Sequence, residues 1–403
     1  MHFDVLKPRN IVVVGAGPVG SVAALACARF GHTVTLLEAQ PRVDDMPRAS
    51  TTQPPTLEIL AELGLIDEYV RVGLVARTFE FWDRPTRSRI AEFDFERLRG
   101  ETDFPYVVQT EQHKLANMAL ERLRAMPDAE VIMGCAVGSL AQDAAGVTVS
   151  AGEREFRADY VIGADGGRST VRKSLGIEFE GYTWPERFLV VTTKFDFAAA
   201  LGCCLRSYMA DPQEWTNLFK VAGDDLKGRW RAVFNTREDE SDEEALSDAA
   251  VRARLARCHA PGADWVHLNL YNVHQRVAKN FRKGRVFLCG DAAHVNNPIG
   301  GLGLNSGIHE AWDLAELLDK VLRKEADASS LDAYEARRRP LNIEYVQEQT
   351  VANKKRLEER DPAQRAKRFD ELRAMAADPA RHKAFLMRAS LLESARRARS
   401  LPQ

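Results

Sequence analysis

The sequence lacks several features that would assign it to a specialised class of protein. Its six cysteines, among 403 residues, show no CxxC spacing, so neither a zinc site nor a disulfide framework is expected, and a reducing, cytoplasmic setting is predicted. No apolar run is long enough to span a membrane, and the N-terminus lacks the apolar segment of a signal peptide. The formal net charge of −2 gives no reason to expect nucleic acid as a partner.

Near its N-terminus the sequence contains a strand–turn–helix–strand unit. Residues 11–14 are a β-branched run, typical of a buried parallel strand. The GxGxxG turn at 15–20 follows directly, then an alanine-rich helix at 21–30 and a second strand at 33–37 that ends in Glu38. Glycines in this arrangement let a pyrophosphate approach the backbone, and an acid at that position accepts hydrogen bonds from a ribose diol. The pattern therefore predicts a site for NAD or FAD rather than NADP.

Two further strands end in glycine-rich turns. An apolar run at 159–164 leads into Asp165-Gly166-Gly167-Arg168, and another at 286–289 leads into a glycine-rich loop at 290–303. A helix is predicted from about residue 304, with its N-terminal amides facing the same loop. Because the carboxyl ends of parallel strands meet at one edge of a sheet, we expect all three turns to lie together.

Single polar residues near these turns are open to two interpretations. Arg48, in a loop, would reach a pyrophosphate or remain a solvated surface side chain. Gln109, between a strand and a helix, would contact the nucleotide or act as a helix cap or surface amide. Asp165 and Arg172 are expected to form an ion pair.

Between residues 181 and 277 the predicted secondary structure changes, because strand-like runs recur there. Within this segment, Ser241 and Glu244 form a capping box before a predicted helix at 242–258. Beyond residue 330 the chain is helical, and residues 354–403 hold 14 Lys and Arg against seven Asp and Glu. A basic tail of this kind could contact nucleic acid or membrane, although its apolar residues favour packing on the body. We assign residues 1–78, 106–180 and 278–345 to a nucleotide-binding domain, 79–105 and 181–277 to a sheet-rich domain inserted into it, and 346–403 to the tail.

The order GAGPVG…E, GADGGRSTVR and GRVFLCGDAAHVNNPIGGLGLNSG resembles the single-component flavoprotein aromatic hydroxylases of the p-hydroxybenzoate hydroxylase type, over roughly residues 9–345. The resemblance implies an α/β fold with a Rossmann-like FAD-binding domain of the GR2 type, an inserted sheet-rich substrate domain and a C-terminal helical tail. Three departures leave the subfamily open: Asn297 where a second proline is common, Leu302 where a polar residue is frequent, and Glu310 where aspartate is usual.

By that resemblance, Glu38 binds the AMP half of FAD, Arg48 and Gln109 approach the pyrophosphate or ribityl region, and Asp291 bonds the ribityl chain. Pro298 would lie near the reactive C4a atom of the flavin. The whole set of FAD-binding residues implied in this way is Gly15, Gly17, Pro18, Val19, Gly20, Glu38, Ala39, Arg48, Gln109, Asp165, Gly166, Asp291, Pro298, Gly301, Gly303, Leu304 and Asn305.

The activity implied is that of a FAD-dependent monooxygenase. NAD(P)H would reduce FAD, O₂ would form a C4a-hydroperoxide, and oxygen would pass to a small electron-rich ring, a phenol or hydroxypyridine. Ring activation needs a base near the substrate. In addition to Pro298, the catalytic candidates are three residues on one predicted strand: His267, Tyr271 and His274. The alternative is that these three are ordinary sheet residues. Because the chain has a single GxGxxG turn, which is assigned to FAD, NAD(P)H is expected to bind only transiently. The protein is expected to be a monomer or homodimer. No metal is expected.

Two other functions fit the same motifs. A flavin-dependent reductase or halogenase-like oxidoreductase would use the same FAD site, and so would a non-catalytic FAD-binding sensor. The halogenase is disfavoured because the sequence has no WxW motif.

Overall fold

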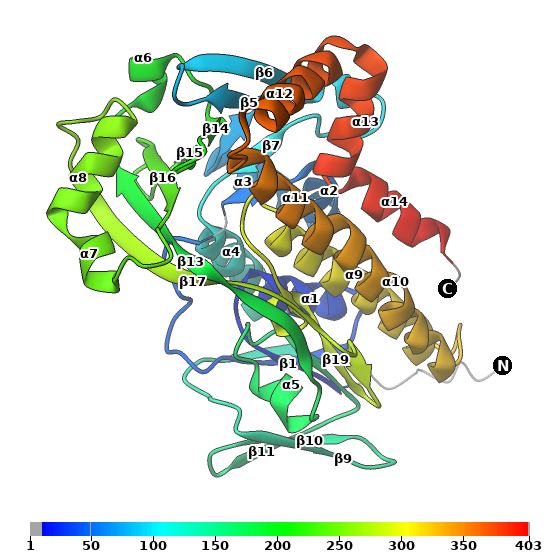
Figure 1. Ribbon diagram of the computed structural model, residues 1–403. Helices are drawn as coiled ribbons and strands as arrows, with labels where there is room; N and C mark the ends of the chain where they lie inside the picture. The colour runs from blue at the N-terminus through cyan, green and yellow to red at the C-terminus, as the bar shows by residue number, and fades with distance from the viewer. Residues whose placement is uncertain (1–9, 49, 402–403) are drawn as a thin grey trace.

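The computed structural model describes residues 10–48 and 50–401. The first nine residues, which belong to the predicted nucleotide-binding domain and to the segment without signal-peptide character, lie outside the described part. Two large sheets, one above the other in Figure 1, form the body, and a helical tail lies along one side. The α/β fold class expected from the sequence is confirmed.

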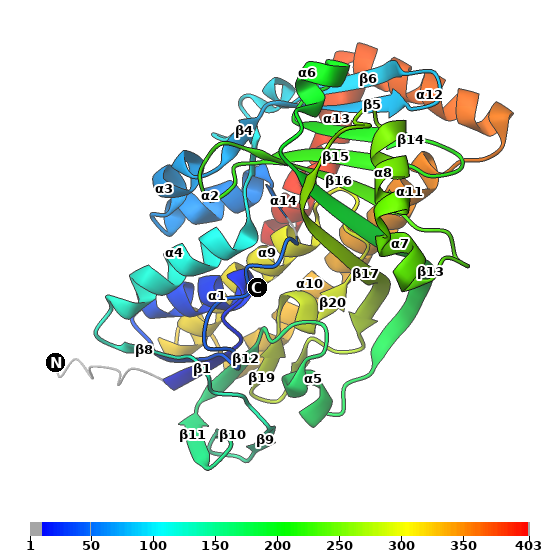
Figure 2. The same cartoon turned by 90° about the vertical axis from the view of Figure 1, so that its left-hand side faces the viewer.

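The lower sheet has six strands in the order β18-β19-β12-β1-β2-β8, and all except β18 are parallel. Its strands are apolar because both faces are covered: α1 and α4 lie on one face, and a three-stranded sheet at residues 139–158 lies on the other, as Figure 2 shows. The elements are β1 (Asn10–Val14), α1 (Pro18–Arg29), β2 (Thr33–Leu37), α4 (Gln112–Arg124), β8 (Ala129–Ile132), β12 (Tyr160–Gly163), β18 (Arg282–Lys283), β19 (Val286–Leu288) and α9 (Gly303–Leu322).

The upper sheet has eight strands in the order β20-β17-β13-β16-β15-β14-β5-β6. Its strands are β5 (Thr78–Asp83), β6 (Ser88–Asp94), β13 (Phe179–Thr193), β14 (Arg206–Ala210), β15 (Thr216–Val221), β16 (Arg229–Asn235), β17 (Trp265–Ala278) and β20 (His294–Val295).

Two of these strands, β13 and β17, are much longer than the others and pair antiparallel from Phe179–Ala278 at one end to Thr193–Trp265 at the other. They run diagonally from the upper part of the molecule to its lower part (Figure 1). The domain boundaries that we predicted at 180/181 and 277/278 fall inside them.

Smaller elements complete the body. A three-stranded sheet joins β9 (Ser139–Gln142), β10 (Val147–Ala151) and β11 (Arg154–Ala158), and another joins β3 (Thr51–Thr52), β4 (Leu74–Ala76) and β7 (Val107–Gln109). The short helices are α2 (Pro54–Glu62), α3 (Ile66–Arg71), α5 (Thr170–Ser174) and α6 (Phe197–Leu201), with single turns η1 (Phe95–Leu98), η2 (Gly290–Ala292) and η3 (Ala328–Leu331).

The helix predicted at 242–258 is wrong as a single element. The structure has two helices, α7 (Asp242–Leu246) and α8 (Asp248–Arg257). Ser247 between them is extended, and its side chain accepts a hydrogen bond from the Ala250 amide, which starts a new helix. The capping box of Ser241 and Glu244 at the start of α7 is confirmed.

The chain after residue 330 is helical, as predicted. It forms α10 (Asp332–Asn342), a π-helical turn η4 (Ile343–Gln347), α11 (Glu348–Leu357), α12 (Pro362–Ala377), α13 (Pro379–Ala389) and α14 (Leu392–Ser400). Leu386 and Leu392 are buried in the same apolar cluster as Phe79 and Phe81 of β5, so the tail packs on the body. Within the described residues, no helix is long and apolar enough to cross a membrane.

Candidate functional site

The three glycine-rich turns lie at one edge of the lower sheet because β1, β12 and β19 are neighbours in it. A Cβ added to Gly15 would come within 2.5 Å of the Ala164 carbonyl oxygen, and one added to Gly290 within 3.0 Å of Val19. Gly307 of α9 approaches both Val19 and Gly290 as closely. The expectation that three separate segments meet at this edge is therefore confirmed.

The first turn is built for close backbone approach. Gly15 has a φ of +104°, and a Cβ on Gly20 would lie 2.0 Å from the Gly15 carbonyl oxygen, so neither position accepts a side chain. Gly17, by contrast, faces open space and is the N-cap of α1, with Pro18 as its first residue and no side-chain cap. The Glu38 carboxylate accepts hydrogen bonds from the amides of Ala16, in the glycine turn, at 2.7 Å and of Gln40, beyond exposed Ala39, at 2.8 Å.

The predicted ion pair between Asp165 and Arg172 is wrong. The Asp165 carboxylate instead accepts hydrogen bonds from the amides of Thr170 and Val171 and so caps α5, next to Gly166 with a φ of +79°. Burial raises the pKa of Asp165 above its usual value, and these hydrogen bonds oppose the rise.

Arg172 has another role. Its guanidinium donates to the carbonyls of Ala292 and Gly167, both at 2.8 Å, and stacks 3.8 Å from the centre of the Phe179 ring. It therefore ties the second glycine turn to the third.

Asp291 lies in η2, directly after β19, and its side chain is open to solvent although many atoms surround it. It therefore stands in a recess. This enclosure raises the pKa of the Asp291 carboxyl, and the charge of Glu310 adds to the rise, while His294 and Arg48 oppose it. A recessed acid beside two glycine turns is suited to accept hydrogen bonds from a sugar alcohol.

A buried network that the sequence did not predict holds this turn. The Glu310 carboxylate, wholly inaccessible on α9, accepts hydrogen bonds from the Gly290 amide at 2.9 Å, the Ser306 hydroxyl at 3.0 Å and His294 Nε2 at 2.8 Å. Burial lowers the pKa of His294, but the Glu310 charge and hydrogen bond outweigh it and raise the pKa overall. The departure from aspartate at 310 was the one sequence signal for this network.

The N-terminus of α9 faces Thr51 and Gln53. Asn305 donates to the Thr51 carbonyl at 2.9 Å and accepts from the Gln53 amide at 2.8 Å. Gly301, with a φ of +66°, lies against Thr51, and its amide donates to the Pro298 carbonyl. The structure thus brings Pro298, Gly301, Gly303, Leu304 and Asn305 together in one loop and helix start, without a side-chain cap on α9.

Arg48 and Gln109 lie differently from the rest. Arg48 is exposed and its guanidinium pairs with exposed Asp44 at 2.7 Å, while its charge also acts on Asp291. Gln109 is fully buried, donates to the carbonyls of Leu205 and Lys220, and accepts from Thr51. Gln109 is therefore neither a helix cap nor a surface amide, and it joins β7 to the upper sheet. Contacts of Arg48 and Gln109 with a nucleotide stay predictions.

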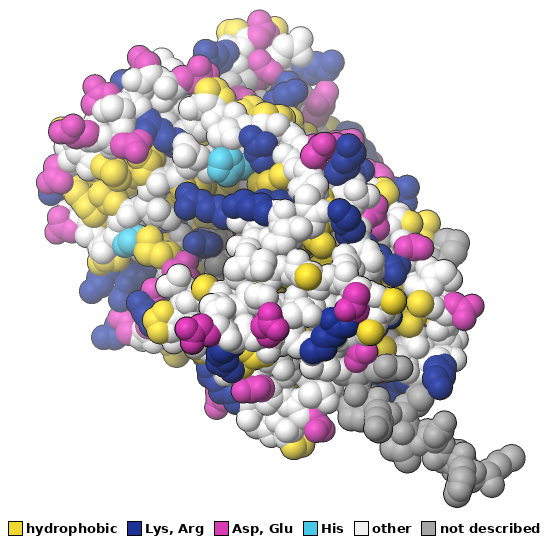
Figure 3. Space-filling model, turned by 90° about the horizontal axis from the view of Figure 1, so that it is seen from below, with side chains coloured by type: hydrophobic (Ala, Val, Ile, Leu, Met, Phe, Trp, Pro, Cys, Tyr) yellow, Lys and Arg dark blue, Asp and Glu magenta, His cyan; other side chains and the backbone are white. Residues whose placement is uncertain are grey.

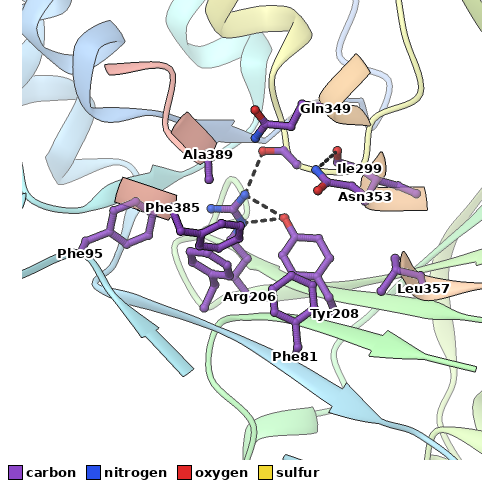
Figure 4. Close-up of a pocket in the computed structure, with 12 residues that line it drawn as sticks. Phe81, Phe95, Arg206, Tyr208, Ile299, Gln349, Asn353, Leu357, Phe385 and Ala389 are labelled. Carbon is purple, nitrogen blue, oxygen red and sulfur yellow. Dashed lines mark hydrogen bonds between the residues drawn. The ribbon is translucent and has the colours of Figure 1, made fainter. Parts of the chain in front are cut away.

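A cavity lies between the upper sheet, the loop after Pro298 and the helical tail (Figure 4). Five of its twelve lining residues are aromatic, and Arg206 is the one charged group among them. The lining residues are Phe79, Phe81, Phe95, Arg206, Tyr208, Ile299, Gly300, Gln349, Asn353, Leu357, Phe385 and Ala389.

Arg206 is only 4% exposed and has no carboxylate within ion-pair distance among the residues that the structure describes. Its Nε and Nη2 donate to the Tyr208 hydroxyl at 3.1 and 2.8 Å, and Nη2 also donates to the Gly300 carbonyl at 2.9 Å (Figure 4). The rings of Phe79 and Tyr208 flank the guanidinium. A buried cation held by aromatic rings and neutral oxygens is suited to bind an anionic oxygen.

The three catalytic candidates on β17 do not line this cavity. Tyr271 and His267 share one face of the strand, as predicted, and burial raises the pKa of Tyr271. His274 is exposed on the other face and hydrogen-bonds Thr183, with its pKa lowered by burial and by Arg276 and Arg168. Sequence reasoning missed Arg206 and Tyr208, whose alternation on one short strand was the only signal.

The residues at the lower edge fit FAD. Gly15 and Gly20 leave no room for side chains, Gly17 is open, and the starts of α1 and α9 both carry free amides without side-chain caps. Glu38 and Asp291 supply acceptors on two different strands. This is the donor and acceptor set that an extended dinucleotide requires.

Comparison with known proteins gives the family of the chain. Residues 9–349 match the family described as FAD binding domain. The chain is 36% identical to para-nitrophenol 4-monooxygenase of Pseudomonas sp. (strain WBC-3), over 94% of each chain. It is 34% identical to 6-hydroxy-3-succinoylpyridine 3-monooxygenase HspB of Pseudomonas putida (strain DSM 28022 / S16), over 88% of this chain and 91% of that protein.

Solved structures give the same picture. The crystal structure of p-nitrophenol 4-monooxygenase PnpA from Pseudomonas putida DLL-E4 superposes with a TM-score of 0.87 at 34% identity, covering 96% of this chain and 98% of that one. A ternary complex of aklavinone-11 hydroxylase with FAD and aklavinone superposes with a TM-score of 0.76 at 29% identity, covering 87% of this chain and 69% of that one.

Proposed function

Because this chain belongs to the family of FAD-dependent aromatic monooxygenases, we propose that it hydroxylates a small phenol or hydroxypyridine, with NAD(P)H and O₂ as its other substrates. The observation that carries the choice of substrate is the aromatic cavity with Arg206 and Tyr208, next to Gly300 and two residues from Pro298. The names of its relatives specify a nitrophenol and a hydroxylated pyridine, both single rings with an oxygen substituent.

The lower edge would hold FAD. Gly15, Gly17 and Gly20 admit the pyrophosphate, Glu38 accepts from the ribose, and Asp291 from the ribityl chain. When bound, FAD takes a hydride from NAD(P)H and passes one oxygen atom of O₂ to the ring. The free amides at the start of α9, at Leu304 and Asn305, would stabilise negative charge on the ring system of the flavin.

Arg206 and Tyr208 would position and activate the substrate. The Tyr208 hydroxyl already accepts two hydrogen bonds from Arg206, so its own hydrogen is available to a phenolic oxygen. A positive charge beside that oxygen stabilises the phenolate, which makes the ring more electron-rich. We therefore assign Arg206 and Tyr208 the activation that the sequence led us to expect from a base on β17.

The walls of the cavity would exclude water from the reacting ring. Phe79, Phe81, Phe95 and Phe385 come from two regions far apart in the chain and close around one space (Figure 4). The absence of water would strengthen the electrostatic interaction between Arg206 and the phenolic oxygen. It would also prevent side reactions with water.

NAD(P)H would bind transiently near Asp165. On this side of the molecule Arg168 and Arg276 both act on His274, which places them close together. Lys and Arg side chains form a row across the middle of the face seen from below (Figure 3), where the phosphates of a dinucleotide would find counter-charges. We propose a cytoplasmic enzyme, monomeric or homodimeric, in keeping with six free cysteines.

The test is product analysis with labelled O₂. The purified protein should be yellow, and NAD(P)H oxidation should rise when 4-nitrophenol or a hydroxypyridine is added. One labelled oxygen atom in the ring product establishes hydroxylation. A protein that oxidises NAD(P)H without transferring label would be a reductase, and a colourless protein that does not take up FAD would refute both.

A further inference from the structure

A row of polar and charged side chains crosses the face of the upper sheet that carries Arg206. Strand register places Arg206 opposite Phe219, Phe219 opposite Arg231, Arg231 opposite Thr192, and Thr192 opposite His267. Residues opposite one another on paired strands share a face, so all five side chains point the same way. The row therefore continues from the aromatic cavity across β15, β16 and β13 to β17.

The far part of this row contains buried polar atoms without hydrogen-bond partners. They are the Arg231 Nε, the Thr192 hydroxyl, His267 Nε2 and the side-chain oxygen of Asn217, which lies on the same face of β15. Buried polar groups are nearly always paired in native proteins, because an unpaired one costs about 1–3 kcal/mol. Four in one patch indicate that something polar completes them.

Arg231 is the centre of the patch. It is 5% exposed, and no carboxylate lies within ion-pair distance of it in the described part of the chain. Burial lowers its pKa, with only partial compensation from the charge of Glu111. Glu111 is itself paired with Lys114 at 2.9 Å. A guanidinium buried in this way lacks the anion that would offset its desolvation.

The patch is closed by the loop that follows β2. Arg231 Nη1 donates to the Arg48 carbonyl at 2.8 Å, and the Asn269 amide donates to the Pro47 carbonyl at 3.3 Å. The side chain of Arg48 is itself exposed.

We propose that Arg231, Thr192, His267 and Asn217 form a second binding subsite, which accepts a planar two-oxygen substituent on the substrate ring, a carboxylate or a nitro group. This rests on the proposed function, since the ring itself would lie at Arg206 and Tyr208. The planar fork of an arginine matches two coplanar oxygens, and Thr192 and His267 add single hydrogen bonds.

The spacing of the two arginines supports a single ligand. Arg206 and Arg231 are separated by two strand spacings, so their Cα atoms are roughly 10 Å apart. The Arg206 guanidinium itself contacts Phe79, Tyr208 and Gly300, so a ring bound beside it would direct a substituent at its opposite end along the row toward Arg231. The subsite would therefore select phenols with a second oxygen-bearing group over phenol itself.

The experiment measures the binding of three probes to the FAD-loaded, full-length protein by calorimetry: phenol, 4-hydroxybenzoate and 4-nitrophenol. We expect the wild type to bind one or both of the substituted phenols at least tenfold more tightly than phenol. In Arg231→Leu that advantage should disappear while the affinity for phenol stays within twofold. Arg237→Leu, which removes an exposed arginine just beyond β16, is the matched control and should change nothing.

Two further variants guard against a general loss of folding. Arg231→Lys keeps the charge but loses the fork, and Thr192→Val keeps the shape but loses the hydroxyl. Each should lower the affinity of the preferred substituted phenol by threefold or more, with FAD retained. Loss for 4-hydroxybenzoate alone identifies a carboxylate, and loss for 4-nitrophenol alone a nitro group.

Equal weakening of all three probes, or none, in every one of these variants would overturn the subsite. So would a wild type that binds phenol as tightly as the substituted phenols. Failure of the proposed function looks different: binding that depends on Arg231 would persist in calorimetry, but no ring compound would stimulate NAD(P)H oxidation or gain labelled oxygen.

Discussion

Asp291 is the residue whose environment most directly suggests a contact with the cofactor, since it is an acid in a recess between two glycine turns. Asp291→Ala should weaken FAD binding by about 1.5–3 kcal/mol, the usual value of a hydrogen bond to a charged group, which is roughly ten- to a hundredfold in affinity. Fluorescence titration of the apoprotein with FAD measures this. An unchanged dissociation constant would remove Asp291 from the site.

His309 on α9 carries a prediction about pH. Its Nε2 lies 3.0 Å from the Thr56 hydroxyl, and burial, with the charges of Arg338 and Arg399, lowers its pKa to about 3. Between about pH 6.5 and 3 the unfolded chain therefore binds a proton that the folded protein refuses. Stability should fall as pH falls through this window, by up to about 1.4 kcal/mol per pH unit from this residue.

His309→Gln removes the proton-binding group and should flatten that dependence. Urea unfolding of both proteins at pH 7.5, 6.0 and 5.0 gives the two slopes. Identical slopes would show that His309 does not govern acid stability.

Single residues also show where sequence reading reaches its limit. Glu38 was predicted because its position depends on a local unit of strand, turn and helix. Arg206 and Arg231 were missed because their meaning comes from the register of separate strands, which places them on one row of one face. An isolated arginine in an apolar strand carries no such information in the sequence.

Among the elements, the loop before α9 depends on an amide network centred on Gln275 of β17. The Gln275 side-chain oxygen accepts from the Asn297 amide at 3.1 Å, and its nitrogen donates to the Gln347 side chain at 2.7 Å. Gln347 ends the π-helical turn η4, and Thr350 on α11 accepts a further hydrogen bond. Gln275 is thus a positioning residue for the loop that contains Pro298.

Gln275→Leu leaves the Asn297 amide and the Gln347 side-chain oxygen buried and without their hydrogen-bond partners, at a cost of about 1–3 kcal/mol each. We expect lower stability in urea. With FAD retained, we also expect a larger share of the NAD(P)H consumed to reduce O₂ to hydrogen peroxide instead of hydroxylating the ring. Adding Asn297→Pro to this variant removes the amide that has lost its hydrogen-bond acceptor and should recover part of the stability. If the coupling ratio of Gln275→Leu equals that of the wild type, the network has only a structural role.

Elements were predicted well wherever their signals were local. The strands before the three glycine turns and the helices after 15–20 and 290–303 were found, since apolar runs and glycines specify both. The helix at 242–258 was wrong because a serine within a charged, alanine-rich segment is compatible with a helix interior and with a cap. Only the packing of the second helix on the sheet decides between them.

At the scale of the whole molecule, the proposed function would place substrate and nucleotide on different layers. We expect an aromatic substrate to accelerate flavin reduction, since the one GxGxxG turn is proposed to serve FAD, which would leave NAD(P)H only a transient site. A ligand does this through a higher affinity for the arrangement that accepts the hydride. Anaerobic stopped-flow with and without 4-nitrophenol measures the reduction rate, and equal rates would reject this control.

The order of the fold could be predicted from sequence only in outline. The two-layer arrangement followed from the change in predicted secondary structure near residue 181. The boundary between the layers, however, was placed inside β13 and β17. Strands that pass through both layers leave no break in composition at which a boundary could be predicted. The cavity was not foreseen, since its walls come from β5, β14 and α13, which nothing in the sequence connects.

The helical tail has a consequence for the timing of biosynthesis. The lower sheet is complete only once β19 at residues 286–288 has been made, and the aromatic cavity waits for Phe385 and Ala389 on α13. A nascent chain therefore acquires its dinucleotide edge roughly a hundred residues before its ring pocket. Until α13 is made, the chain would have its dinucleotide edge but no closed chamber for the substrate, so on the proposed function turnover would have to wait for the helical tail.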